Sequence, residues 1–447
     1  MRDLFVIAGC GSYEDRGCEA VVRGTVEIIS RYYEDPFFVV CGEFSSRGQF
    51  EQQVRNEKDT RIRHVRMHRL PWGLLSRMLP VHRREFKYRK LARSIPKSAA
   101  VLWAGCRALD SDPEKREDLC DLDDLSAAYG RKLVLWGASF SRSWPKPVFE
   151  PPMSRRLGIQ AALFCVESSS IEFLKTIGVE NNVFQVCDPA FALQAQEPGD
   201  AWRYGDLSRS IGVCLGPGFA DRLAQGDKEG WLETACHLTR AIASAGHPVA
   251  LVPYNCEPDA NEFLFLRSVA SRLQNHDVCL IQPHHSAAEI KWLIGRMVLF
   301  CGTNPDAMVA ALTARVPAIA LACGQREIGI HHDIFGHRGY CLGPGDTDPV
   351  KVMLAVTTAL LSREQVRETL EKKMGEMIWE AYKNGKLLRS INTVFDRPDR
   401  MDRLSRYDDS PRLYGLRTAR AARRLFAQSG QALFGRIFRG WRPEGRT

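Results

Sequence analysis

Short, nearly continuous apolar runs alternate with helix-like segments along most of the chain, and this alternation limits the fold more than any other feature. The predicted strands are Leu4–Ala8, Phe37–Cys41, Ala99–Trp103, Leu133–Gly137, Ala161–Val166, Val183–Val186, Ile211–Leu215, Pro248–Pro253, Val278–Ile281, Val298–Cys301 and Ala318–Leu321. The predicted helices between them include Glu19–Tyr32, Ile171–Ile177 and Ala307–Ala314. Strands that are apolar along their whole length and separated by helices indicate parallel sheets covered on both faces.

The strands form two series, with a break at Gln194–Ser208, where Gln-Glu-Pro-Gly-Asp interrupts the pattern. We therefore predict an α/β protein with two Rossmann-like domains, residues 1–205 and 206–386, the second ending in closing helices. Residues 387–447 are predicted to form a linker and a basic amphipathic tail. Open parallel sheets bind ligands beyond the carboxyl ends of their strands, so the cleft between two such domains is the expected site.

The positive charge of the chain is concentrated in its tail. The net charge is +9, but nine of the 62 basic residues and one of the 53 acidic residues lie between Pro411 and Thr447. The rest of the chain therefore carries only +1. Since no nucleic-acid-binding module is recognisable either, we expect no nucleic-acid partner.

Two further features of composition concern the location of the chain. No run of about 18 apolar residues occurs, so no transmembrane helix is predicted. The 14 cysteines include no CxxC pair, and many lie inside apolar runs. Such cysteines are typical of reduced, buried thiols, which favours a cytoplasmic location.

Residues Arg412–Trp441 can be read as an amphipathic helix. Phe434, Ile437, Phe438 and Trp441 follow helical spacing, with arginines between them. Arginines beside aromatic residues suit the surface of an anionic membrane, so one interpretation is peripheral contact with the inner face of the cell membrane. The other interpretation is a helix packed on its own domain or a partly disordered tail.

A glycine-rich turn follows the first predicted strand and leads into Arg16-Gly17-Cys18-Glu19-Ala20. By itself such a turn is a weak signal, because a tight strand-to-helix connection is the commoner explanation. No Gly-Lys-Ser/Thr follows, so the turn is not a Walker loop.

Five further motifs follow in order, and with the first they carry a resemblance. The first of these five consists of Ser170, Leu174 and Gly178, which follow Val166, and the second is Asp188-Pro189-Ala190-Phe191. The third is Glu289-Ile290-Lys291, and the fourth joins Ala310-Ala311-Leu312 with Val316-Pro317. The fifth joins Gly329-Ile330 with Asp333-Ile334-Phe335-Gly336. Over about residues 4–345 the chain resembles the polysaccharide pyruvyl transferase family.

The resemblance implies a GT-B-like pair of domains and a transferase of surface polysaccharide or exopolysaccharide biosynthesis. Its reaction would move pyruvate from phosphoenolpyruvate to two hydroxyls of a sugar, with a glycan or lipid-linked sugar as acceptor. Phosphoenolpyruvate is the donor substrate, and no cofactor is implied. The positions expected to bind substrate are Asp15, Arg16, Gly17, Glu19, Ser170, Glu289, Lys291 and His331.

The chain departs from the family at its Arg-x-His motif, where Asn304 and Asp306 occupy the two positions. Arginine binds phosphate and carboxylate bidentately, and histidine can supply a proton. The change therefore removes a cation and adds an acid beside an anionic donor. Arg326 lies near a family lysine and is a candidate replacement, so Asn304, Asp306 and Arg326 are the predicted catalytic residues.

Other departures and alternatives accompany this change. Val166 and Glu167 replace an Arg-Asp pair, Tyr254 replaces a histidine, and Gly105-Cys106 falls short of a double glycine. The alternative interpretation of Arg16, Lys291 and Arg326 is a solvated surface charge, the usual place for such side chains.

Adjacent histidines occur at His284-His285 and His331-His332. Neighbours on a strand or helix point in different directions, so neither pair is expected to chelate a metal, and no metal site is predicted. Loop or surface positions are favoured. The resemblance places His331 on the loop before Asp333, from which it could enter the cleft as an acid.

The sequence leaves three functions open. The first is the pyruvyl transferase reaction. The second is a catalytically inactive member that binds a glycan or an assembly partner at the membrane, which the altered Arg-x-His motif favours. The third is a related transferase that uses a nucleotide sugar.

Overall fold

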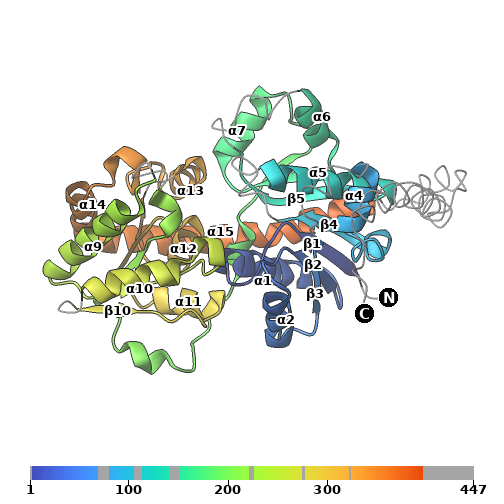
Figure 1. Cartoon of the computed structure of the whole chain (residues 1–447). Coiled ribbons are helices and arrows are strands. Elements are labelled where there is room, and N and C mark those ends of the chain that lie inside the picture. The colour runs from blue at the N-terminus through green and yellow to red at the C-terminus, as the bar shows by residue number, and fades with distance from the viewer. Residues whose placement is uncertain are drawn as a thin grey trace, which may run out of the picture. The chain divides into compact units, whose positions relative to one another are not determined.

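The computed structural model of the chain describes residues 3–68, 80–104, 113–140, 151–220, 226–273, 277–321 and 324–395. Within these ranges the chain forms two parallel sheets with helices packed around them (Figure 1). Both sheets belong to one compact unit, Met1–Ile391.

The first sheet has seven strands among the described residues, in the order β3-β2-β1-β4-β5-β6-β7, and all neighbours are parallel. Its strands are β1 (Leu4–Ala8), β2 (Phe37–Gly42), β3 (Ile62–Arg66), β4 (Ser98–Trp103), β5 (Leu133–Ala138), β6 (Ala162–Cys165) and β7 (Val183–Gln185). The strand order reverses between β1 and β4. Such a reversal opens a crevice at the carboxyl ends of the strands.

The second sheet has six strands in the described ranges, in the order β10-β9-β8-β11-β12-β13, again parallel throughout. Its strands are β8 (Ile211–Cys214), β9 (Val249–Leu251), β10 (Val278–Leu280), β11 (Leu299–Gly302), β12 (Ala318–Leu321) and β13 (Cys341–Leu342). Here the order reverses between β8 and β11, so each sheet has its own crevice.

Helices connect the strands and cover the sheets. They are α1 (Arg16–Ser30), α2 (Arg47–Asn56), α4 (Pro80–Lys87), α5 (Pro113–Ala128), α6 (Pro151–Ile159), α7 (Ser168–Thr176), α9 (Lys228–Ser244), α10 (Glu262–Arg272), α11 (Ala287–Ile294), α12 (Pro305–Thr313), α13 (Gln325–Phe335), α14 (Pro349–Leu361) and α15 (Arg363–Phe395). Two 3₁₀ helices matter for the site, η4 (Pro189–Ala192) and η5 (Ala201–Tyr204).

The central strand β1 shows why these sequences form sheets covered on both faces. Phe5 and Ile7 belong to one apolar cluster, whereas Val6 and Ala8 belong to another. Successive side chains of a strand point to opposite faces, so an entirely apolar strand needs a core on each side.

The long C-terminal helix α15 packs against parts of the protein that are distant in sequence (Figure 1). Leu370 and Met374 join the apolar cluster that contains Phe5 of β1. Near its other end, the Asn384 side-chain amide donates to the carbonyl oxygen of Cys187, 3.1 Å away. The expected helical C-terminal region thus packs back on the first sheet.

The predicted fold class is confirmed, and the main errors are at the sheet edges. Ten predicted strands agree to within one residue at either end, and β9 (Val249–Leu251) is shorter than its predicted run, Pro248–Pro253. The sequence missed β3, whose charged Arg63 and Arg66 interrupt the apolar pattern, and the two-residue β13. The predicted boundaries at 205 and 386 stay a prediction. Gly105-Cys106 and Arg412–Trp441 lie outside the described residues.

Two expectations about composition can be compared with the structure. Within the described ranges, no helix combines the length and apolar character needed to cross a membrane. Most of the cysteines that the structure describes are buried. Buried thiols pack much as small apolar side chains do.

Gly24 allows α1 to lie directly against η4, and we expect its replacement by alanine to be strongly destabilising. A Cβ atom at this position would overlap the backbone carbonyl of Pro189. Overpacking against backbone typically costs about 3 kcal/mol, because rigid atoms must move. Thermal melting should therefore show a clearly lower Tm for Gly24→Ala.

The matched control is Gly375→Ala on α15, where a Cβ atom meets nothing within 4 Å. Alanine should there stabilise the helix by about 0.5–1 kcal/mol. Equal melting temperatures for the two variants would contradict the packing of α1 on η4.

Candidate functional site

The carboxyl edges of the two sheets meet through backbone contacts. The turn after β1 pairs with the loop after β9, because Asp15 and Asn255 form an isolated antiparallel bridge. The amide of Arg16 donates to the carbonyl of Tyr254 at 3.0 Å, and the amide of Cys256 donates to that of Glu14 at 2.8 Å. The strand ends at which such sheets bind ligands are therefore brought together.

Asp15 is the N-cap of α1. One of its carboxylate oxygens accepts from the amides of Gly17 at 2.8 Å and Cys18 at 3.4 Å. The carboxylate satisfies two amides at the positive end of the helix, so this motif has a structural role in the protein. It also explains why α1 begins at Arg16, three residues before the predicted start.

Arg16 and Glu19 attach α1 to the loop before α11. The Arg16 Nη2 atom donates to the carbonyl of Pro283 at 2.6 Å, and Nη1 donates to that of Tyr13. The carboxylate of Glu19 accepts from the amide of Ala287 at 2.9 Å, and burial raises its pKa. Both side chains are buried and engaged by backbone, which contradicts the solvated interpretation of Arg16.

Lys291 and Glu289 of α11 have separate roles. The Lys291 Nζ atom is buried and donates to the carbonyl of Leu193 at 2.7 Å. Burial lowers the pKa of Lys291 to about 8. Glu289 forms a capping box with Ser286, whose amide and hydroxyl both donate to its carboxylate. The structure thus places Lys291 in the interior and Glu289 at a helix end.

Asn304 is the N-cap of α12, a role that an asparagine followed by proline suits well. Its side-chain oxygen accepts from the amides of Asp306 at 3.0 Å and Ala307 at 3.2 Å. Its Nδ2 atom donates to Glu262 at 2.8 Å. Burial raises the pKa of the Glu262 carboxyl, which also accepts from two backbone amides. Asn304 is therefore held on both sides of its amide group.

Arg326 lies between two carboxylates that come from different parts of the chain. Its Nη2 atom is 2.6 Å from Asp188, which follows β7, and Nη1 is 3.1 Å from Asp306 in the first turn of α12. Arg326 and Asp188 are buried, whereas the Asp306 side chain is 16% exposed. We call Asp188, Asp306 and Arg326 the Arg326 cluster. Arg326 is thus not a solvated surface charge.

Glu167 borders the Arg326 cluster on the side of α7. Burial raises its pKa to about 7, while hydrogen bonds from Ser170 and Ser139 and the charge of Arg326 oppose the shift. Its second oxygen is buried without a hydrogen-bond partner. Such a carboxyl group is protonated up to near-neutral pH, because burial penalises the charged form.

The elements α7 and α13 approach closely around Glu167. A Cβ atom on Gly329 would lie 2.6 Å from Cγ of Glu167, so only glycine fits there without movement. The Ser168 hydroxyl donates to Asp333 of α13 at 2.6 Å. Ser170 faces the other way and bonds the backbone of Phe140. Ser170 thus orients Glu167, and Asp333 attaches α7 to α13.

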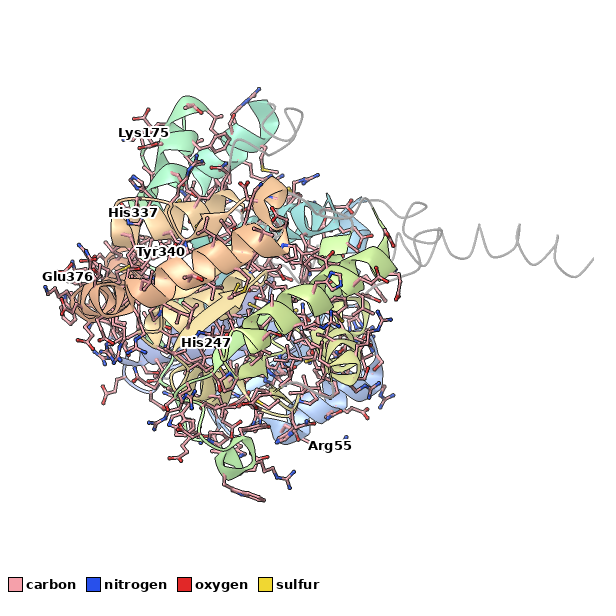
Figure 2. All side chains as sticks on the ribbon, turned by 90° about the vertical axis from the view of Figure 1, so that its left-hand side faces the viewer. Arg55, Lys175, His247, His337, Tyr340 and Glu376 are labelled. Atoms are coloured by element: carbon pink, nitrogen blue, oxygen red, sulfur yellow. The ribbon has the colours of Figure 1, made fainter. Side chains whose placement is uncertain are left out.

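His331 does not lie on a loop, as the resemblance suggested, but within α13. Its side chain is fully buried, and Nδ1 lies 2.6 Å from the sulfur of Cys341. Burial and then His337 lower the pKa of His331 to about 4. Its ring packs near Tyr340, which Figure 2 labels beside His337 beyond the end of α13. A neutral, enclosed imidazole of this kind is a core side chain.

The structure brings together two groups of the predicted residues. Asp15, Arg16, Gly17 and Glu19 lie at the start of α1, where Arg16 and Glu19 bond the loop before α11. Asn304, Asp306 and Arg326 meet at the start of α12. Sequence reasoning did not assign Asp188, Glu167 or Glu262 to the site. The Asp-Pro-Ala-Phe motif was a signal for Asp188, and the replaced Arg-Asp pair was one for Glu167. Nothing in the local sequence indicates Glu262.

Similarity to proteins of known structure agrees with this architecture. A UGT transferase from Siraitia grosvenorii in complex with UDP has a TM-score of 0.55 and 12% identity, covering 88% of this chain and 99% of its own. A UDP-N-acetylglucosamine 2-epimerase described as putative, from Listeria monocytogenes, has a TM-score of 0.56 and 14% identity, covering 89% and 97%. At these identities the likeness establishes the GT-B-like fold alone.

Comparison of sequences gives the family. No curated protein matches the chain. The model of one family, described as polysaccharide pyruvyl transferase, matches residues 16–325. This range includes the helix α1, the Asp188 motif and the α12 region, and it covers most of the chain. The chain therefore belongs to the polysaccharide pyruvyl transferase family.

Proposed function

We propose that the protein transfers pyruvate from phosphoenolpyruvate to a sugar of a surface polysaccharide or of its lipid-linked precursor. The observation that carries the proposal is Arg326, a buried cation of α13 that faces the start of α12, in a member of this family. A guanidinium has five N–H groups, and the contacts with Asp188 and Asp306 use Nη1 and Nη2 once each. Donors therefore remain for an anion.

The positive end of α12 adds to this charge. The donor carries a phosphate and a carboxylate, and helix N-termini favour such groups by about 0.3–1 kcal/mol at exposed sites. Asp306 is the more exposed partner of Arg326. In the proposed complex, the donor displaces Asp306 from the guanidinium, while Asp188 keeps Arg326 in place.

Glu167 is a further ionisable group beside Arg326, and its protonation affects the net charge that the donor meets. Since its pKa is raised to about 7, this carboxyl is neutral below that pH and does not repel the donor. It has almost no exposure, so we assign it a positioning role toward Arg326 rather than contact with substrate.

Asp306 is the proposed acid–base group, because it occupies the position of the family's histidine. In the reaction, the donor's CH₂ carbon gains a proton and becomes a methyl group, and one sugar hydroxyl attacks the central carbon. The second hydroxyl then displaces phosphate, which leaves with the other hydroxyl proton. A diol and phosphoenolpyruvate thus give a ketal and phosphate, and Asp306 moves one of the two protons.

A catalytically inactive member that binds a glycan is the second candidate, and the Arg326 cluster itself favours it. Two carboxylates already neutralise the Arg326 guanidinium, while Arg16 and Lys291 are buried and donate to backbone carbonyls. The two candidates differ in turnover, so measurements of phosphate release and donor binding distinguish them.

We expect Arg326→Gln to weaken binding of phosphoenolpyruvate by about 10- to 100-fold, the usual loss for a hydrogen-bonded charge. Isothermal titration calorimetry on the purified chain measures this, with Arg338→Gln as the exposed control after the same helix. Thermal melting of each variant checks that the fold is kept. Absence of both donor binding and phosphate release in the unaltered chain would exclude the enzyme.

Asp306→Asn should separate binding from chemistry. Removing the carboxylate takes away repulsion, so we expect tighter donor binding. Loss of the acid–base group should slow phosphate release by about 10²-fold or more. Unchanged release in the presence of a competent acceptor would remove Asp306 from the mechanism.

Glu167 should make stability depend on pH. Its folded pKa is about 7 and its unfolded pKa near 4.5, so the folded state holds the proton more tightly. Ionisation of the buried Glu167 carboxyl lowers the free energy of unfolding. This loss is absent below pH 4.5, grows as the pH rises, and is complete above about pH 7, where it reaches roughly 3 kcal/mol. Glu167→Gln keeps an acceptor for Ser139 and Ser170 but cannot ionise.

The melting temperature of Glu167→Gln relative to the unaltered chain should therefore rise between pH 5 and pH 8. Glu172→Gln, on the exposed face of the same helix, is the control and should show no such trend. If the melting temperatures of Glu167→Gln and of the unaltered chain changed with pH in the same way, a buried, neutral Glu167 would be contradicted.

We further propose that residues Arg412–Trp441 bring the protein to an anionic membrane that carries its lipid-linked acceptor. The support is the arginine-rich amphipathic pattern of the sequence. The full chain should pellet with vesicles containing anionic lipid, less so at high salt, whereas a chain ending at Ser410 should not. Equal pelleting of both chains would refute this role.

A further inference from the structure

Two histidines and an aspartate meet near the junction of the sheets, outside the Arg326 cluster. Asp200 precedes η5 in the segment between β7 and β8, and His284 and His285 lie between β10 and α11. One ligand atom of each residue lies within 4.8 Å of the others. We propose that Asp200, His284 and His285 bind a divalent transition-metal ion, Zn²⁺ in the first instance.

The histidines can act together because they do not lie on a strand or a helix. Residues 283 and 284 form a turn, and the two imidazole centroids are only 4.2 Å apart. The divergence of neighbouring side chains, which argues against a chelating pair on regular elements, therefore does not apply here.

The distances suit a small tetrahedral ion. Bonds of about 2.0–2.1 Å to Zn²⁺ place ligand atoms roughly 3.3 Å from one another. His284 Nε2 is 3.2 Å from one carboxylate oxygen of Asp200, and His285 Nε2 is 3.8 Å from the other. All three ligand atoms lie within 4.8 Å of one another, so the side chains would close toward this spacing when the ion binds. Two imidazoles and a carboxylate favour Zn²⁺ over the oxygen-preferring Mg²⁺ and Ca²⁺.

Burial of the three side chains differs in a way that suits an ion entering from solvent. The His285 side chain is 1% exposed, Asp200 is 25% exposed and His284 is 59% exposed. The Tyr204 hydroxyl lies 2.7 Å from His285 Nε2 and accepts from the amide of Gln282 at 3.1 Å. On metal binding, this hydroxyl would exchange its bond to His285 for one to a metal-bound water.

A metal ion at this position would link two segments of the chain. It would connect the segment between the two sheets with the loop that leads into α11. The same loop is held to α1 by Arg16 at Pro283 and by Glu19 at Ala287. A bound ion would therefore fix the contact between α1 and α11, whether or not the protein transfers pyruvate.

The experiment uses the full chain, stripped with a chelator and titrated with Zn²⁺ alone by calorimetry. We expect one ion per chain and a higher melting temperature. Asp200→Asn and His284→Ala should each weaken binding at least tenfold, and both positions are exposed enough to tolerate change. His237→Ala, an exposed histidine on α9, should bind as the unaltered chain does.

Cobalt(II) distinguishes this site from the many thiols of the chain. The unaltered protein should give d–d bands without a thiolate charge-transfer band, and His284→Ala should lose them. Binding that is equal in all four proteins, or a cobalt spectrum with thiolate character that His284→Ala leaves unchanged, would overturn the proposal.

Discussion

The ion pairs of Arg326 connect segments that the chain order keeps far apart. The arginine is on α13, Asp306 is on α12, and Asp188 follows the last strand of the first sheet. Breaking a buried pair from one side typically costs about 3–5 kcal/mol, because an uncompensated charge remains in the interior. The juxtaposition of the two sheets and the charge at their shared edge therefore depend on the same side chain.

Close backbone approach makes this geometry possible. Gly24 lets α1 reach the Asp188–Pro189 turn, and Gly329 lets α13 reach Glu167. The backbone contacts between the turn after β1 and the loop after β9 add a second attachment between the sheets. Motifs that resemble ligand-binding sequences thus serve first to bring the sheet edges together.

The contacts of Asn304 and Asp306 show what these two residues do at the start of α12. Asn304 caps its own helix and bonds the buried Glu262, so that position contributes a helix end rather than a cation. Asp306 pairs with Arg326, so this carboxylate is balanced by a cation from another helix. The guanidinium that pairs with Asp306 at the start of α12 therefore comes from α13.

Local sequence determined most of the strands, the parallel sheets, the start of α12 and the family. Apolar runs need a core on both faces, and capping residues act on neighbouring amides, so both are visible in short windows. The edge strand β3 was not predicted, because one side of it meets solvent and its sequence therefore lacks a continuous apolar run. Only the tertiary structure decided that Arg16 and Lys291 bind backbone carbonyls, that Arg326 pairs with Asp188, and that His284 and His285 face Asp200. Those partners lie tens to hundreds of residues away, and the burial that sets their charge exists only once the two sheets have met.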